Sequence, residues 1–243
     1  MPSPRIYLDA PLGSDAQIQL PEDAARHLVQ VLRLGAGDRF TVFNGQGGEF
    51  EATLDAVGKR ASTARIGAFL DVRRDSPLRV TLAQCVSKGD RMDYAVQKAV
   101  ELGVAEIQPL LSARSVVRLD EERSEKKLEH WRGVIISACE QCGRTELPLL
   151  RPMLSLTQWL EQADPSLRLV LLPGSGESLR SLEAPTRPLS LLVGPEGGLD
   201  DEELREAVRH GCEPISLGPR VLRTETAGVA ALAALQAIFG DLV

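Results

Sequence analysis

Two turns near the C-terminus carry the residues whose types and spacing could do chemistry. The first is Gly194-Pro195-Glu196-Gly197-Gly198, which follows an apolar run and leads into the acidic segment 199–203. Its glycines let the backbone approach a ligand closely, and Asp200 with Glu203 has the pattern of a helix N-cap with its capping-box partner. Because these acids already complement the helix dipole, the turn disfavours a phosphate and favours a neutral or cationic ligand. On composition alone, an ordinary strand-to-helix turn stays open as the alternative.

The second turn is Leu217-Gly218-Pro219-Arg220-Val221-Leu222-Arg223-Thr224-Glu225-Thr226-Ala227. Thr224 is a plausible N-cap of the helix that follows, which is apolar nearly all round and is therefore expected to be buried. Two arginines beside a buried helix are costly unless they pair with a carboxylate such as Glu225 or face a cleft. The sequence leaves both possibilities open.

The usual fingerprints of nucleotide and metal sites are absent from the sequence. There is no G-x-x-x-x-G-K-S/T and no complete G-x-G-x-x-G after a strand. Cys139 and Cys142 form a C-x-x-C without a second pair, and the three histidines make no ligand spacing. No metal is therefore expected.

Residues 78–243 are predicted to form the domain that positions both turns. Apolar runs with little alternation, typical of strands buried on both faces, occupy 79–86, 104–110, 167–172, 188–194 and 213–218. Helices are predicted between and after them, at 91–102, 125–142, 156–162, 200–210 and 224–239. Alternation of strands and helices indicates an α/β fold with a parallel sheet.

Residues 1–72 are predicted to form a small β-barrel with one helix. Five short segments alternate partly between apolar and polar residues, at 5–8, 16–20, 38–45, 48–57 and 61–70. A helix is expected from Pro21 to Gly35, and the glycine-rich segment 44–48 predicts a hairpin. The charged run that ends at Pro77 places a linker at residues 73–77.

Composition narrows the class of protein further. The chain has 243 residues, 43% of them hydrophobic and 26% charged, which excludes a disordered chain. It contains neither a run long enough to span a bilayer nor an apolar signal segment, and its four cysteines fit a reducing cytoplasm. Residues 161–243, with 7 basic and 13 acidic side chains, carry the whole net charge of -6. Weak nonspecific affinity for RNA follows from that charge.

The two turns together resemble those of the RsmE family, SPOUT-class methyltransferases that act on a uridine N3 of small-subunit ribosomal RNA. The resemblance covers essentially the whole chain in the right order. Further segments that match the family are 26–33 in the first domain and 88–93, 98–104 and 138–144 in the second. Cys142 and Val221 stand where the family often has Ser and Ile, which are substitutions of similar size.

The resemblance implies a fold, a cofactor and partners. It implies a C-terminal SPOUT domain with a trefoil knot over residues 78–243 and an N-terminal PUA-like β-barrel over residues 1–72. It implies S-adenosyl-L-methionine (SAM) as cofactor, 16S rRNA in the small ribosomal subunit as substrate and a homodimer. The expected activity is methylation of N3 of a specific uridine. A non-catalytic RNA-binding ribosome assembly factor is the alternative.

Residue roles follow from the same resemblance and from the chemistry of the reaction. Arg220 and Arg223 are expected to stabilise the anion of a deprotonated uracil, and Glu196 or Glu225 is a candidate base. The residues expected to bind the cofactor are Leu171, Leu172, Pro173, Gly194, Pro195, Glu196, Gly197, Leu217, Gly218, Leu222, Arg223 and Thr224. The residues expected to contact RNA phosphates are Arg26, Arg33, Lys88, Arg91 and Arg144.

Overall fold

The computed structural model describes residues 3–58, 61–115, 121–175 and 177–242. The chain divides into two compact units, one of residues 1–75 with 136–147 and one of residues 76–135 with 148–243. The sequence places residues 136–147 in the second domain, whereas the structure groups them with the first unit. The linker at 73–77 stays a prediction.

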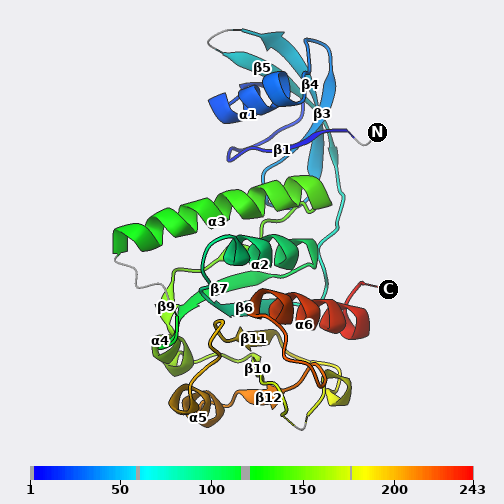
Figure 1. Cartoon of the computed structure of the whole chain (residues 1–243). Coiled ribbons are helices and arrows are strands. Elements are labelled where there is room, and N and C mark those ends of the chain that lie inside the picture. Colours follow the sequence, from blue (N-terminus) through cyan, green and yellow to red (C-terminus); the bar gives the residue numbers. More distant parts are fainter. Residues whose placement is uncertain (1–2, 59–60, 116–120, 176, 243) are drawn as a thin grey trace. The chain divides into compact units, whose positions relative to one another are not determined.

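The first unit contains a five-stranded sheet in the order β1-β3-β4-β5-β2 (Figure 1). These strands are β1 (Arg5–Tyr7), β2 (Gln17–Gln19), β3 (Arg39–Phe43), β4 (Glu49–Val57) and β5 (Ser62–Leu70). β1 and β3 are parallel and the other pairs are antiparallel. Apolar side chains alternate onto one face, where Phe40, Leu54 and Ile66 form a core with Leu28. Closure of this sheet into a barrel stays a prediction.

The helix of the first unit is shorter than the sequence predicts. It runs through α1 (Glu22–Arg26) and a π-helical turn, His27–Val31, and ends before Gly35. Arg33 adopts a φ of 60°, and the Leu34 N–H turns back to the Leu28 carbonyl (2.9 Å). This left-handed residue ends the helix. The predicted hairpin is present between β3 and β4, with positive φ at three glycines of 44–48.

The second unit contains a sheet in the order β12-β10-β11-β6-β7-β8, with β9 also paired to β7 and every pair parallel. The strands are β6 (Val80–Cys85), β7 (Glu106–Leu111), β8 (Leu149–Leu150), β9 (Leu154–Ser155), β10 (Leu167–Leu171), β11 (Leu189–Val193) and β12 (Glu213–Ile215). The parallel α/β prediction is therefore confirmed. The sequence missed β8 and β9 because two-residue strands show no periodicity.

Helices cover both faces of this sheet. The helices on its faces are α2 (Asp90–Glu101), α4 (Leu156–Glu161), α5 (Asp201–Arg209) and α6 (Thr224–Phe239), with a 3-10 turn at Leu179–Ser181. The long helix α3 (Glu121–Cys142) has its residues 136–142 in the first unit. α2 and α6 lie side by side, and α6 packs on β6 and β11 (Figure 1). Trp159 of α4 and Ala207 of α5 belong to an apolar cluster with Ala83 and Cys85 of β6. Side chains alternate along a strand, so Gln84 points to the α6 face.

Helix α6 is buried along one face only. Gly228, Ala231, Leu232 and Leu235 are buried, whereas Ile238 is 47% exposed. The expected burial is therefore present on the face of α6 that packs against the sheet and α2. No helix in the described part of the chain is long and apolar enough to cross a membrane. The described residues also include no group of three His, Cys, Asp or Glu side chains that could hold a metal.

Candidate functional site

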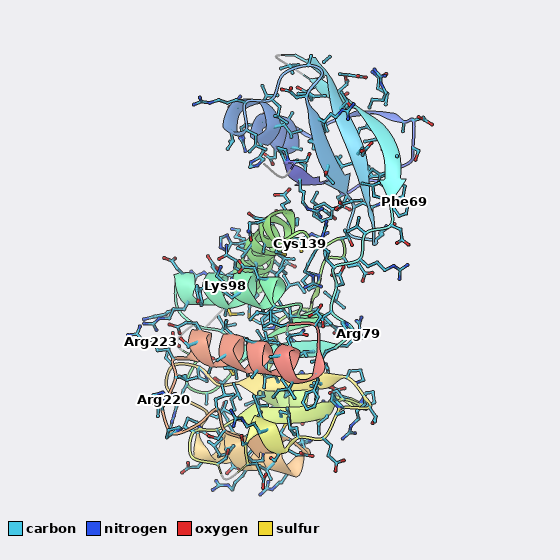
Figure 2. All side chains as sticks on the ribbon, turned by 90° about the vertical axis from the view of Figure 1, so that its right-hand side faces the viewer. Phe69, Arg79, Lys98, Cys139, Arg220 and Arg223 are labelled. Atoms are coloured by element: carbon cyan, nitrogen blue, oxygen red, sulfur yellow. The ribbon has the colours of Figure 1, made fainter. Side chains whose placement is uncertain are left out.

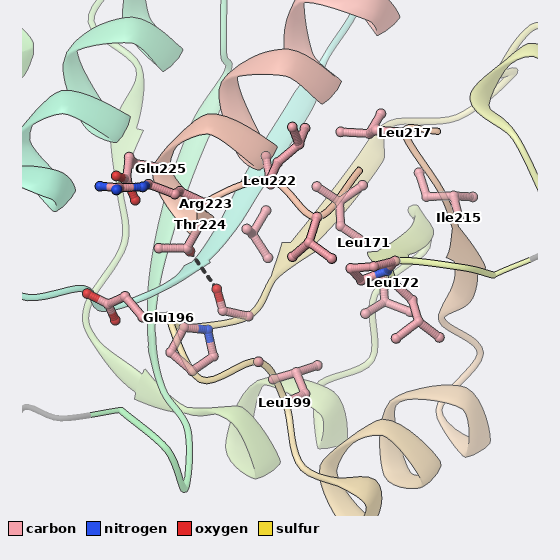
Figure 3. Close-up of a pocket in the computed structure, with 18 of the residues that line it drawn as sticks. Leu171, Leu172, Glu196, Leu199, Ile215, Leu217, Leu222, Arg223, Thr224 and Glu225 are labelled. Atoms are coloured by element: carbon pink, nitrogen blue, oxygen red, sulfur yellow. Dashed lines mark hydrogen bonds between the residues drawn. The ribbon is translucent and has the colours of Figure 1, made fainter. Parts of the chain in front are cut away.

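A cavity of about 390 Å³ lies at the carboxyl ends of β10, β11 and β12, where parallel sheets commonly bind ligands. The loops that follow these three strands build it, together with the start of α6 (Figure 3). Its wall is mainly apolar. The apolar lining residues are Val170, Leu171, Leu172, Val193, Leu199, Leu204, Ile215, Leu217, Val221, Leu222 and Ala227.

The structure brings nearly all the residues predicted to bind the cofactor to this one cavity. The residues of that set that line it are Leu171, Leu172, Pro173, Gly194, Pro195, Glu196, Leu217, Gly218, Leu222, Arg223 and Thr224. Gly197 is the exception, because it faces the side chain of Arg114. Its carbonyl accepts a hydrogen bond from Arg114 Nη1 (2.9 Å).

The turn after β11 is fixed by the start of α5, as the sequence predicts. Asp200 Oδ1 accepts hydrogen bonds from the backbone N–H groups of Glu202 (2.9 Å) and Glu203 (2.8 Å). Glu203 Oε2 accepts the Asp200 N–H in return (3.0 Å), which completes the capping box. Glu203 Oε1 also accepts the N–H of Ala113 (2.6 Å), so the loop after β7 is attached to the same turn.

Thr224 is not the N-cap that the sequence predicts. Arg223 occupies that position without a side-chain cap, and Thr224 is the first residue of α6. The Thr224 hydroxyl instead donates to the carbonyl of Gly194 (2.6 Å; Figure 3) and accepts from Gln84 Nε2 (2.9 Å). Capping would use the hydroxyl oxygen as an acceptor for a backbone N–H, and here that oxygen accepts from Gln84 instead.

Arg220 and Arg223 lie at the cavity without carboxylate partners in the described part of the chain. Both are exposed, and within the described residues neither guanidinium has an ion pair. The alternative in which they pair with Glu225 is therefore not observed. Figure 2 shows both side chains on the same side of the second unit. They are free to contact a ligand.

The two candidate carboxylates differ in their surroundings. Glu196 Oε1 accepts hydrogen bonds from the Lys88 N–H (3.2 Å) and from Arg91 Nη1 (2.8 Å). Partial burial alone would raise the pKa of Glu196, but these bonds, its own backbone N–H and the charge of Arg91 outweigh burial and lower that pKa. Glu225 lies 3.9 Å from Arg91 Nε through Oε1, and its buried Oε2 has no hydrogen-bond partner among the described residues.

The residues expected to contact RNA differ in their exposure and in their ion pairs. Lys88 is exposed, and Arg91 lines the cavity between Glu196 and Glu225. In the first unit, Arg26 is exposed and pairs with Asp23 (2.6 Å). Arg33 is exposed at the left-handed residue that ends the helix.

Arg144 does not lie on the surface, as a phosphate contact would require. It is 6% exposed, and its Nε donates to Asp75 Oδ1 (2.7 Å). A phosphate could reach this guanidinium only by disrupting a buried ion pair, so its placement gives the predicted contact no support.

Sequence reasoning missed two residues around the site. Arg114 contacts the Gly197 carbonyl from the loop after β7, and nothing in the sequence links that loop to residues 83 positions later. Gln84 holds Thr224 from within β6. The sequence did mark this residue, because Gln84 is a polar residue next to Cys85 in the otherwise mainly apolar run 79–86.

Comparison with known proteins identifies the class of protein to which this fold and cavity belong. Residues 74–236 match the family of RNA methyltransferase domains, and residues 20–67 match the RNA methyltransferase PUA domain. The structure superposes with a TM-score of 0.96 on a Legionella pneumophila protein solved with bound SAM, at 43% identity over 100% of both chains. The chain is thus an RNA methyltransferase with a PUA domain.

Two further relatives carry a more specific name. The Neisseria gonorrhoeae ribosomal RNA small subunit methyltransferase E, solved bound to SAM, has a TM-score of 0.93 and 37% identity, over 99% of this chain and 100% of that one. The enzyme of the same name from the Schizaphis graminum strain of Buchnera aphidicola is 33% identical over 98% of each chain. The chain belongs to the ribosomal RNA small subunit methyltransferase E family, which confirms the resemblance found in the sequence.

Proposed function

We propose that this chain transfers a methyl group from SAM to N3 of a specific uridine in the 16S rRNA of the small ribosomal subunit. One observation carries the proposal: one mainly apolar cavity gathers two arginines without an ion pair and a buried carboxylate oxygen without a hydrogen bond, both counted among the described residues. The names of the relatives and the SAM bound in two similar structures support it. The alternative, a non-catalytic assembly factor, would not need this set of groups.

The residues of the cavity fit SAM. Its volume of about 390 Å³ lies in the range of small-molecule sites, and Leu171, Leu172 and Leu222 offer an apolar surface for adenine. The backbone N–H groups of Leu217 and Leu222 make no hydrogen bond within the described residues and can bind polar edges. Glu196 and Glu225 suit a cationic ligand. Bound SAM supplies an electrophilic methyl group on a sulfonium.

The side chains at the cavity supply what methylation of uridine N3 needs. This nitrogen carries a proton on the Watson–Crick edge, so the base must be unpaired when it reacts, and loss of the proton leaves negative charge on O2 and O4. Arg220 and Arg223 stabilise that charge as positioned donors. Glu225 is the better candidate for the base. The hydrogen bonds to Glu196 lower the pKa of Glu196 and make Glu196 the weaker proton acceptor, whereas Oε2 of Glu225 has no hydrogen bond among the described residues.

RNA recognition is shared between the two units. Lys88 and Arg91 in the second unit and Arg26 and Arg33 in the first contact phosphates. The net charge of -6 disfavours nonspecific binding, so the enzyme selects its target by shape, on the assembled small subunit. Residues 1–72 serve as the PUA-like RNA-binding barrel, 73–77 as linker and 78–243 as the catalytic domain.

The second unit adopts the SPOUT trefoil knot, and the protein acts as a homodimer in the cytoplasm. Support for the knot comes from the path of the chain: after β12 at the edge of the sheet, residues 216–223 return to the middle, where Thr224 bonds to Gly194. Support for the dimer comes from Ile238 and Leu242, apolar residues each 47% exposed at the end of α6 and just beyond it.

The test is methyl transfer from SAM to small subunits isolated from a strain that lacks this protein, followed by nucleoside analysis. We expect one 3-methyluridine per subunit. The matched control is naked 16S rRNA, which should accept far less methyl. Label on another nucleoside would reject the substrate, and the absence of any label would favour the assembly factor.

A further inference from the structure

A buried chain of hydrogen bonds lies behind the cavity wall. Gln84 is 0% exposed, and its Nε2 donates to the Cys85 carbonyl (3.0 Å) and to Thr224 Oγ1 (2.9 Å). The Thr224 hydroxyl donates in turn to the Gly194 carbonyl (2.6 Å; Figure 3). Thr224 and Gly194 line the cavity, whereas Gln84 does not. The chain thus joins the central strand β6, the first residue of α6 and the turn after β11.

The direction of these bonds is fixed at both ends. A backbone carbonyl can only accept, so the Cys85 carbonyl requires the NH2 side of the Gln84 amide, which turns the second N–H toward Thr224. The Thr224 hydroxyl must then accept from Gln84 and has its single hydrogen left for Gly194. No other proton arrangement satisfies all three bonds.

The arrangement leaves one polar atom without a partner. Gln84 Oε1 is buried and makes no hydrogen bond within the described residues. A buried unpaired oxygen destabilises the fold, and an apolar side chain at this position in β6 would avoid that penalty. A glutamine at this position is therefore better explained by the hydrogen bond with which it holds Thr224 than by a contribution to the stability of the fold.

We infer that Gln84 and Thr224 form a positioning pair that sets the Gly194 carbonyl, and with it the turn 194–198, for binding the methyl donor. The inference rests on the proposed function, because it takes SAM as the ligand of the cavity. Gln84 acts through Thr224 and does not touch the ligand. Loss of either polar group lets the turn move relative to α6, which weakens donor binding.

The test is calorimetric titration of the full chain with S-adenosylhomocysteine, alongside the thermal midpoint of each variant. Thr224→Val keeps the shape and removes the hydroxyl, and we expect about tenfold weaker binding. Thr224→Ser keeps the hydroxyl and should bind within about twofold of the wild type. Gln84→Met should match Thr224→Val. Ser190→Ala, which removes another buried hydroxyl from β11, is the control that should lower the midpoint without weakening binding.

Two further variants separate positioning from loss of stability. Because Gln84 and Thr224 act through one bond, the double variant Gln84→Met/Thr224→Val should bind no more weakly than Thr224→Val alone. Gly228→Ala would place a Cβ 3.2 Å from Gln84 Oε1, and alanine favours a helix. We expect it to weaken binding without lowering the thermal midpoint.

Three results would overturn the inference. The first is wild-type affinity in both Thr224→Val and Gln84→Met. The second is a loss of affinity in the double variant equal to the sum of the two single losses. The third is a loss of affinity in Ser190→Ala as large as that in Thr224→Val. If Thr224→Val does not fold, unchanged affinity in Gly228→Ala overturns it. Absence of binding by the wild type would instead contradict the proposed function itself.

Discussion

Two arginines of the first unit, Arg5 and Arg144, and two at the cavity of the second, Arg220 and Arg223, are placed in opposite ways. In the first unit, Arg144 is 6% exposed and bonded to Asp75, and Arg5 pairs with Glu49 and also donates to the Arg144 carbonyl (2.9 Å). At the cavity, Arg220 and Arg223 are exposed and have no ion pair within the described residues. A buried arginine with a fixed carboxylate holds a fold together, whereas an exposed arginine in a cleft is available to a ligand.

The largest expected effect on stability is at the buried pair Arg144–Asp75. Arg144→Ala leaves Asp75 partly buried without its partner, and we expect a loss of about 3 kcal/mol in the free energy of unfolding. Denaturant unfolding of the full chain measures it. Arg73→Ala, at a side chain that is 85% exposed, is the matched control and should change stability little. Equal stability of the two variants would show that Arg144 is not structural.

The next effect concerns the carboxylates of the cavity. Glu225→Gln removes the proposed base, and we expect kcat to fall by roughly 10²–10⁴. Glu196→Gln is isosteric and serves as the comparison, with a smaller loss, because Glu196 is engaged by Arg91 and Lys88. Single-turnover methyl transfer measures both. A larger loss in Glu196→Gln would reverse the assignment.

The unpaired arginines should affect the reaction and not the fold. We expect Arg220→Ala and Arg223→Ala each to lower kcat by roughly 10² with little change in thermal midpoint, since an anion-stabilising donor is lost. Arg205→Ala, an exposed arginine of α5 that pairs with Glu202, is the control and should keep full activity. A midpoint shift as large as that of Arg144→Ala would mean that these arginines, too, are structural.

The smallest effect concerns the thiols. Burial raises the pKa of Cys85 and Cys139 to about 12 and that of Cys212 to about 11, so these thiols stay protonated and unreactive at pH 8. Cys142 is only half-buried. We expect a thiol-specific disulfide reagent to modify Cys142 first, without loss of activity. Equally rapid modification of all four cysteines would mean that the native packing opens readily.

The sequence predicted the residues of the cavity better than it predicted which arginines are buried in ion pairs. Both glycine-rich turns, the capping box at Asp200 and the parallel sheet depend on local patterns, and the structure contains each of them. Burial of Arg144 and the bond from Thr224 to Gly194 depend on residues 69 and 30 positions away, respectively. No periodicity reports contacts at such distances, so the paired and the unpaired arginines look alike in the sequence.

A crystal structure of the full chain with S-adenosylhomocysteine is the most direct test of the view that the cavity is the donor site. We predict that the adenine packs against Leu171, Leu172 and Leu222, with the sulfur on the side of the cavity that holds Arg220, Arg223 and Glu225. A nucleoside bound elsewhere, or a cavity closed by its own leucines while the ligand binds another surface, would contradict the account.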